Sequence, residues 1–259
     1  MSSTKAHKQI IWLMGGLGNQ LFQVQFGNWL RQTFNRKIEY NIALTRKSYV
    51  TAVMGWSIHD YVLEDVVDLD GELFIDELNP ITILCSKLRF LPNHAFFHGL
   101  EGVNANSHRN LFGYFQNKLL SEEMFDTCSL RLRQKTSLHY DFVMHLRGGD
   151  VNNPVPAEKY YGDALELCNP SLIHVVTDSR DLLKRIADTH SKHSFIDVSG
   201  SVVTDFNSLA SARKIIVAPS TFSWWAARLG ASEEIWLPNE IHEKLGKPKL
   251  NNNVRYELV

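Results

Sequence analysis

The sequence of 259 residues has few cysteines, no excess of charge of one sign and no long hydrophobic run. Its three cysteines, Cys85, Cys128 and Cys168, are an odd number and lie far apart without C-x-x-C spacing. This pattern excludes a disulfide framework and disfavours a cysteine-based zinc site. Reduced thiols in a cytoplasmic protein are the simplest interpretation.

The charges almost cancel, because the sequence has 27 lysines and arginines and 28 aspartates and glutamates. A general nucleic-acid binder uses a basic excess to neutralise phosphates, and this chain lacks one. Any anion site must therefore be a local cluster of donors. The hydrophobic fraction of 44% and the charged fraction of 21% are typical of a globular protein with its own core. The length allows one large domain or two modest ones.

The longest uncharged stretch, Gln9 to Leu30, follows Lys5 and Lys8 and superficially resembles a signal peptide. Its apolar run, Ile10–Met14, is too short for that role, and the asparagines and glutamines after it are costly in lipid. We expect a buried strand and a helix instead. No other window approaches about 18 apolar residues, so we expect a soluble protein, at most peripheral to a membrane.

The N-terminus reads as strand, glycine loop, helix and strand. Ile10–Met14 is continuously apolar, Gly15–Asn19 interrupts it, and aromatic residues from Phe22 to Phe34 recur at helical spacing. Ile38, Tyr40 and Ile42 alternate as in a second strand. Periodicity is weak from 45 to 110, after which we expect a strand at 111–115 and a helix at 119–132.

The second half alternates regularly between strands and helices. The expected strands are 142–146, 172–176, 195–198, 215–218 and 235–237, and the expected helices are 160–168, 179–189, 204–213 and 222–229. Ser179 is a candidate N-cap, and Gly230 is a candidate C′ residue. This alternation predicts a parallel sheet covered on both faces, within an α/β protein of two halves that meet near residue 140.

Ligands of open parallel sheets bind beyond the carboxyl ends of the strands. The first such segment is Gly15–Gln20, where glycines allow close backbone approach and leave helix N–H groups available to an anion. It is not a P-loop, because no Gly-Lys-Ser/Thr follows. A tight turn without any ligand explains it equally well.

The second segment is His145–Asp150. Strand alternation turns His145 and Arg147 to one face, and an arginine beside two glycines suits a forked grip on phosphate oxygens. A surface ion pair between Arg147 and Asp150 is the alternative for the arginine. For His145 the alternative is a core histidine.

Two further segments follow strands. Asp178 follows the strand at 172–176 and suits a ribose or base edge, although helix capping explains it equally well. Ser220–Ser223 places hydroxyl groups at a helix start, where the dipole favours a pyrophosphate. Trp224 and Trp225 after them are more typical of the core.

The remaining motifs are weak or missing. Asp68-Leu69-Asp70 matches the D-x-D of metal-dependent sugar transferases, but it lies in an acidic stretch typical of a solvated turn. No H-E-x-x-H, G-x-S-x-G or Cys/His ligand spacing is present, which disfavours zinc hydrolysis and Ser-His-Asp hydrolysis.

Together these segments resemble the bacterial α1,2-fucosyltransferase family. Four stretches match in order, namely GGLGNQLFQ at 15–23, GYFQ at 113–116, the H-x-R-R-x-D-like 145–150 and STFSWWA at 220–226. The resemblance implies a GT-B-like fold of two Rossmann-like α/β domains facing across a cleft. Residues 1–140 would form the acceptor-side domain, and residues 141–259 the GDP-sugar-binding domain.

The resemblance also implies a reaction. It is the transfer of L-fucose from GDP-fucose, with inversion, to the galactose 2-hydroxyl of a bacterial surface polysaccharide or O-antigen type glycan. No metal or other cofactor is expected. The implied catalytic residues are Arg147, Asp150 and His145. Those implied to bind the donor are Gly16, Gly18, Asn19, Gln20, Arg147, Asp178, Asp205, Ser220, Thr221, Phe222 and Ser223. Those implied to bind the acceptor are Asn19, Gln20, Tyr114 and Gln116.

One departure from the family pattern affects the donor. The second arginine of the family motif is Gly148 here, and Val151 replaces the following aromatic residue. One expected cation near the donor phosphates is therefore absent. Another GDP-deoxysugar such as GDP-colitose is an alternative donor, and a non-catalytic GDP-sugar or glycan-binding protein is an alternative on the same scaffold.

Overall fold

A computed structural model describes residues 8–46, 62–69, 71–77, 94–97, 110–116, 122, 124, 130–133, 139–148, 157–248 and 254–259. The chain divides into two compact units. Unit 1 comprises Met1–Glu64 and Asp68–Leu130, and unit 2 comprises Asp65–Val67 and Arg131–Val259. The domain assignment made from the sequence, with its division between residues 140 and 141, stays a prediction.

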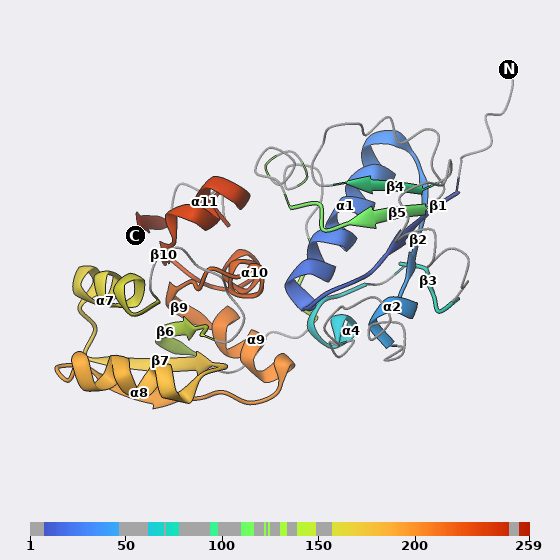
Figure 1. The fold of residues 1–259 in the computed structure, drawn as a ribbon. Helices are drawn as coiled ribbons and strands as arrows, with labels where there is room; N and C mark the ends of the chain where they lie inside the picture. The colour runs from blue at the N-terminus through green and yellow to red at the C-terminus, as the bar shows by residue number, and fades with distance from the viewer. Residues whose placement is uncertain are drawn as a thin grey trace, which may run out of the picture. The chain divides into compact units, whose positions relative to one another are not determined.

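Unit 1 contains a five-stranded parallel sheet in the order β3-β2-β1-β5-β4 (Figure 1). The strands are β1 (Lys8–Trp12), β2 (Lys37–Asn41), β3 (Phe74–Ile75), β4 (His94–Phe97) and β5 (Asn110–Gly113). The helices are α1 (Leu17–Phe34), α2 (Ala43–Arg46) and α4 (Leu63–Val66), the last lying at the division between the units. The strand, helix and strand expected at the N-terminus are confirmed.

Helix α1 is buried from Leu17 to Leu30 except at Asn19, which explains why its only charged residue, Arg31, comes in the last turn. Its glutamines are paired inside the fold, since Gln25 Nε2 donates to the Met124 carbonyl at 2.9 Å. Gly27 allows a close approach to β2, because a Cβ atom there would lie 2.3 Å from Tyr40 Oη. The segment is thus part of the core, as expected. Among the helices that the structure describes, none has the length and apolarity to span a membrane.

Unit 2 contains a six-stranded parallel sheet in the order β11-β10-β9-β6-β7-β8. The strands are β6 (Tyr140–Leu146), β7 (Leu172–Thr177), β8 (Ser194–Asp197), β9 (Ala212–Ile216), β10 (Glu234–Leu237) and β11 (Arg255–Leu258). The helices are α7 (Ala157–Cys168), α8 (Arg180–Thr189), α9 (Val202–Ala210), α10 (Thr221–Leu229) and α11 (Asn239–Leu245). Counted along the unit from its opposite edge, the strand order is 3-2-1-4-5-6, the order of a dinucleotide-binding Rossmann sheet. The predicted α/β class with parallel sheets is confirmed.

Several element ends differ from the sequence-based expectations. Helix α9 begins at Val202 because the Ser201 hydroxyl accepts a hydrogen bond from the Thr204 N–H, and β9 already begins at Ala212. The expected helix at 204–213 was therefore placed too late in the chain. The helix expected at 119–132 lies largely outside the described residues, and Leu132 forms a β-bridge with Val67 instead.

The two capping predictions had different outcomes. The Ser179 hydroxyl accepts from the Leu182 N–H and caps α8, as expected. Gly230 follows α10 with φ −84° and ψ −166°, so it is not a left-handed C′ residue. Glycine is needed there because a Cβ atom would lie 2.2 Å from the Ala210 carbonyl oxygen.

Candidate functional site

The strand order of unit 2 reverses between β6 and β9, which lie side by side in the sheet. Ligands of open α/β sheets bind beyond the carboxyl ends of the strands at such a switch point. The two segments that leave these strands are Arg147–Gly148 after β6 and Val217–Ser220 after β9. The structure thus brings together two segments that lie about 70 residues apart and that the sequence singled out separately.

A side chain of α7 and one of the loop after β7 hold the backbone at Arg147 and Gly148. The Arg147 N–H donates to Tyr161 Oη at 2.9 Å, and the Gly148 N–H donates to the Asp178 carboxylate at 2.8 Å. Asp178 therefore acts on the loop, and its predicted contact with a ribose or base stays a prediction. The Arg147 side chain itself is half-buried.

Gly148 lies against the start of α8. A Cβ atom there would lie 3.0 Å from Ser179 Cβ and 3.0 Å from Leu182 Cδ2. A larger side chain at this position needs a shift of the α8 N-terminus. Local packing thus leaves little room for a larger side chain at residue 148.

His145 is buried in β6 and points to the same region as Arg147. Burial, and secondly the charge of Arg147, lower the pKa of His145 to about 3. Its ring lies 5.7 Å from the ring of Phe222 in α10, and its Nδ1 atom has no hydrogen-bond partner among the described residues. His145 is therefore neutral near pH 7, and so low a pKa makes it a poor general base.

The hydroxyls at the start of α10 shape the loop. Ser220 Oγ accepts from the Phe222 N–H at 3.2 Å and caps the helix. Ser223 Oγ accepts from the Ala218 N–H at 3.1 Å, and the Ser223 side chain is fully buried. Ser223 thus positions the loop through its hydroxyl, while Thr221 and Phe222 are partly exposed in the first turn. Trp224 and Trp225 are buried in the core, as expected.

Asp205 lies in the first turn of α9, close to α10 in the fold. Its carboxylate accepts from the Gly200 N–H at 2.6 Å. Burial raises the pKa of Asp205, and this hydrogen bond opposes the shift. The rings of Phe206 and Phe222 meet edge to face at 5.3 Å and join α9 to α10. No observation tests the predicted contact of Asp205 with the donor.

In unit 1 the predicted acceptor residues gather at the carboxyl edge of the sheet, where β1 and β5 are neighbours. Gln116 Nε2 donates to Asn19 Oδ1 at 2.6 Å, and Gln20 Nε2 donates to the Gly15 carbonyl at 2.8 Å. Gly15 has a φ of +75°, and a Cβ atom there would lie 3.2 Å from the Tyr114 ring. Gly16 is the N-cap of α1, and Gly18 is buried in its first turn.

Sequence reasoning missed the role of Gln23. Its Oε1 accepts from the Met14 N–H at 2.9 Å, and its Nε2 donates to the Gly113 carbonyl at 2.8 Å. The fully buried amide thus ties the ends of β1 and β5 together. The available signal was a glutamine among the apolar positions of a helix expected to be buried, because a buried amide needs partners.

Two acidic residues singled out from the sequence, Asp150 and Asp70, lie outside the described residues. Asp68 is exposed. Within the described ranges, no group of three or more His, Cys, Asp or Glu side chains is arranged to hold a metal ion.

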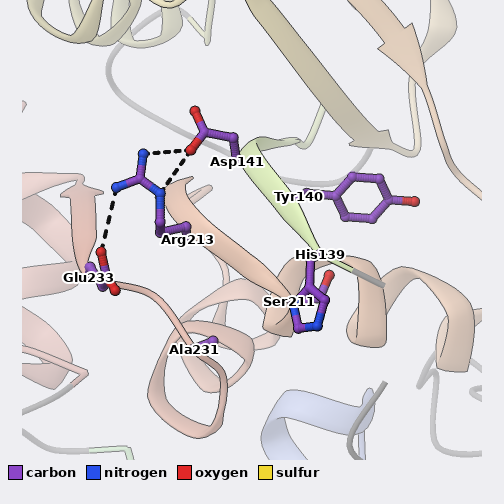
Figure 2. A pocket seen from close by; sticks show the side chains of 7 residues that line it. All are labelled: His139, Tyr140, Asp141, Ser211, Arg213, Ala231 and Glu233. Atoms are coloured by element: carbon purple, nitrogen blue, oxygen red, sulfur yellow. Dashed lines mark hydrogen bonds and ion pairs between the residues drawn. The ribbon is translucent and has the colours of Figure 1, made fainter. Parts of the chain in front are cut away.

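A hollow of about 390 Å³ lies at the amino edge of the unit 2 sheet, away from the switch point. Figure 2 shows the Arg213 guanidinium there between two carboxylates, at 2.5 Å from Asp141 and 3.5 Å from Glu233. Because both partners are acidic, the charge of Arg213 is neutralised locally. The hollow holds none of the predicted site residues, and its lining is His139, Tyr140, Asp141, Ser211, Arg213, Ala231 and Glu233.

Part of unit 2 is similar in sequence to one enzyme family. The family model "Glycosyl transferase family 11" matches residues 155–253, which is less than half of the chain. This range includes the STFSWWA segment but not Arg147. No curated protein matches the chain.

Similar solved structures share the fold at low identity. A mutant of Arabidopsis thaliana FUT1 in complex with GDP is 11% identical over 92% of this chain and 71% of that chain, with a TM-score of 0.51. Fucosyltransferase NodZ from Bradyrhizobium is 13% identical over 87% and 94%, with a TM-score of 0.48. Escherichia coli heptosyltransferase WaaC with ADP is 10% identical over 97% and 93%, with a TM-score of 0.46. The likeness to FUT1 spans both units and agrees with the predicted GT-B-like fold class.

Proposed function

We propose that the protein is a glycosyltransferase that moves L-fucose from GDP-fucose, with inversion, to the 2-hydroxyl of a galactose in a glycan. The observation that carries the proposal is the position of Arg147 at the end of β6, beside the strand that leads into α10. The family match over 155–253 and the four ordered sequence segments support it. So does the fold shared with FUT1, whose structure contains GDP.

The chemical problem in such a transfer is the charge of the leaving group. As the anomeric bond breaks, negative charge develops on the β-phosphate of GDP. Arg147 and the positive end of α10 are suited to stabilise this charge. A hydrogen bond to a charged group is worth about 1.5–3 kcal/mol. Loss of one such transition-state donor costs roughly 10²- to 10³-fold in rate.

The acceptor hydroxyl loses a proton during the reaction. The low pKa of His145 argues against this residue as the base, which leaves Asp150 as the candidate from the sequence. An oxocarbenium-like transition state places little demand on the base, because the bond to the leaving group is largely broken before the acceptor attacks. We therefore assign the larger share of the rate enhancement to Arg147.

We assign acceptor binding to the carboxyl edge of the unit 1 sheet. The Asn19 and Gln116 side-chain amides are suited to hydrogen-bond sugar hydroxyls, and the Tyr114 ring, 42% exposed, offers a stacking face. Because Gly148 stands where the family motif has a second arginine, another GDP-deoxysugar such as GDP-colitose is an alternative donor. A GDP-sugar or glycan-binding protein without catalysis is the second candidate, favoured by the same missing cation.

The proposal includes the setting of the reaction. The arginine and the backbone amides would carry the diphosphate charge without a metal ion. The substrate would be a carrier-linked precursor of a bacterial surface polysaccharide or O-antigen, modified in the cytoplasm.

Mass spectrometry of products from a panel of GDP-sugars and galactosyl acceptors tests the proposal. We expect one added deoxyhexose from GDP-fucose, at a linkage that maps to the galactose 2-hydroxyl. Arg147→Ala should lose at least about 10²-fold in turnover. Arg213→Ala, at the opposite edge of the same sheet, should keep its activity. Tight GDP binding without transfer to any acceptor would instead favour the binding protein.

A further inference from the structure

Helix α7 carries two adjacent tyrosines that reach the two central strands of unit 2. The Arg147 N–H, just after β6, donates to Tyr161 Oη at 2.9 Å. Tyr160 Oη donates to the carbonyl of Val217, just after β9, at 2.6 Å. Both tyrosines belong to a buried hydrophobic cluster that also contains Phe142, Met144 and Leu146 of β6. One helix thus contacts both sides of the switch point.

The hydroxyl of Tyr161 has a specific task. The side chain is fully buried, so a phenylalanine would fill the same apolar space. Placing a hydroxyl in an apolar core is unfavourable unless it is hydrogen-bonded. Here the hydroxyl oxygen accepts a hydrogen bond from the Arg147 amide.

The backbone around Arg147 is held from several directions. Asp178 accepts from the next amide, that of Gly148, and the close approach of Ser179 limits movement at residue 148. Of these contacts, the one at Tyr161 acts on the Arg147 amide itself. It therefore fixes the point from which the guanidinium extends.

We propose that Tyr161 is a positioning residue for Arg147, with its hydroxyl holding the arginine backbone where the guanidinium reaches the donor diphosphate. This inference rests on the proposed function, in which Arg147 binds that diphosphate. Tyr161 acts through Arg147 and does not touch the donor. Its effect on ligand binding must therefore disappear when the arginine side chain is removed.

A double-mutant cycle with GDP as the probe tests this coupling. GDP affinity is measured by calorimetry for the full chain, Tyr161→Phe, Arg147→Ala and the double variant. We expect Tyr161→Phe to weaken GDP binding roughly 2- to 10-fold, as for one lost hydrogen bond. In the Arg147→Ala background the same change should have no effect. Tyr160 donates its hydrogen bond to the Val217 carbonyl on the β9 side, so any change of GDP affinity in Tyr160→Phe should be the same with and without the Arg147 side chain.

The outcomes separate the inference from the proposed function. No effect of Tyr161→Phe, an equal effect in both backgrounds, or the same dependence on Arg147 for Tyr160→Phe overturns the positioning role. If Arg147→Ala binds GDP as tightly as the unmodified chain, the proposed function itself fails. Should Tyr161→Phe not fold, meta-fluorotyrosine at position 161 keeps the ring and weakens the acceptor. The same coupling to Arg147 is then expected, and its absence overturns the inference.

Discussion

Acid should destabilise unit 2 through His145, and the size of the effect follows from its burial. The pKa of this imidazole is about 3 in the folded protein, against 6.5 for an ordinary histidine. Below pH 6.5 the unfolded chain binds a proton that the folded chain does not, so stability falls as the pH decreases. The stabilisation is fully present above pH 6.5 and is lost progressively toward pH 3. Each pH unit in this window costs about 1.4 kcal/mol, so the step to pH 5 costs about 2 kcal/mol.

The assay is urea unfolding at pH 7 and pH 5, with fluorescence detection of the buried tryptophans of α10. In His145→Gln, which has no imidazole, we expect the loss of stability between the two pH values to be about 2 kcal/mol smaller than in the unmodified chain. An equal loss in both proteins would refute the reasoning. It would mean that His145 is protonated in the folded state or that its environment is wetter than described.

Three further predictions concern metal independence, packing and thiol reactivity. Transfer activity should survive EDTA, measured as product formed with and without chelator, whereas strict Mn²⁺ dependence would instead implicate Asp68 and Asp70. Gly230→Ala should lower the free energy of unfolding by about 1–3 kcal/mol, because the added Cβ meets the Ala210 carbonyl; unchanged stability in urea titrations would contradict this close approach. Burial raises the pKa of Cys168 to about 12, so little reactive thiolate forms at pH 8. Mass spectrometry of native protein treated with iodoacetamide at pH 8 should show the Cys168 peptide unalkylated, and rapid alkylation would count against the burial of this thiol.

The sequence predicted the fold where local patterns were strong. The continuous apolar run at β1 and the aromatic spacing of α1 were sufficient for unit 1 to be read as α/β at its N-terminus. In unit 2, regular alternation located β6, β7 and β10 closely. The short elements β3 and β11 were missed, because pairing with a distant strand stabilises them and no local periodicity marks them.

The candidate site was predicted in part for a related reason. Residues at strand ends, such as Arg147 and Ser220, could be singled out because parallel strands present their carboxyl ends at one edge. The partners that hold the loops could not be found this way. Tyr161 and Gln23 act through hydrogen bonds to distant backbone atoms, which leave no pattern in the sequence. The burial of Ser223 likewise depends on how the β9–α10 loop folds back.

A crystal structure of the full chain soaked with GDP bears most directly on the whole interpretation. We expect the diphosphate beside the Arg147 guanidinium and the first turn of α10, at the carboxyl ends of β6 and β9. A nucleotide bound elsewhere, for example in the hollow around Arg213, or an Arg147 side chain turned away from the phosphates, would contradict it.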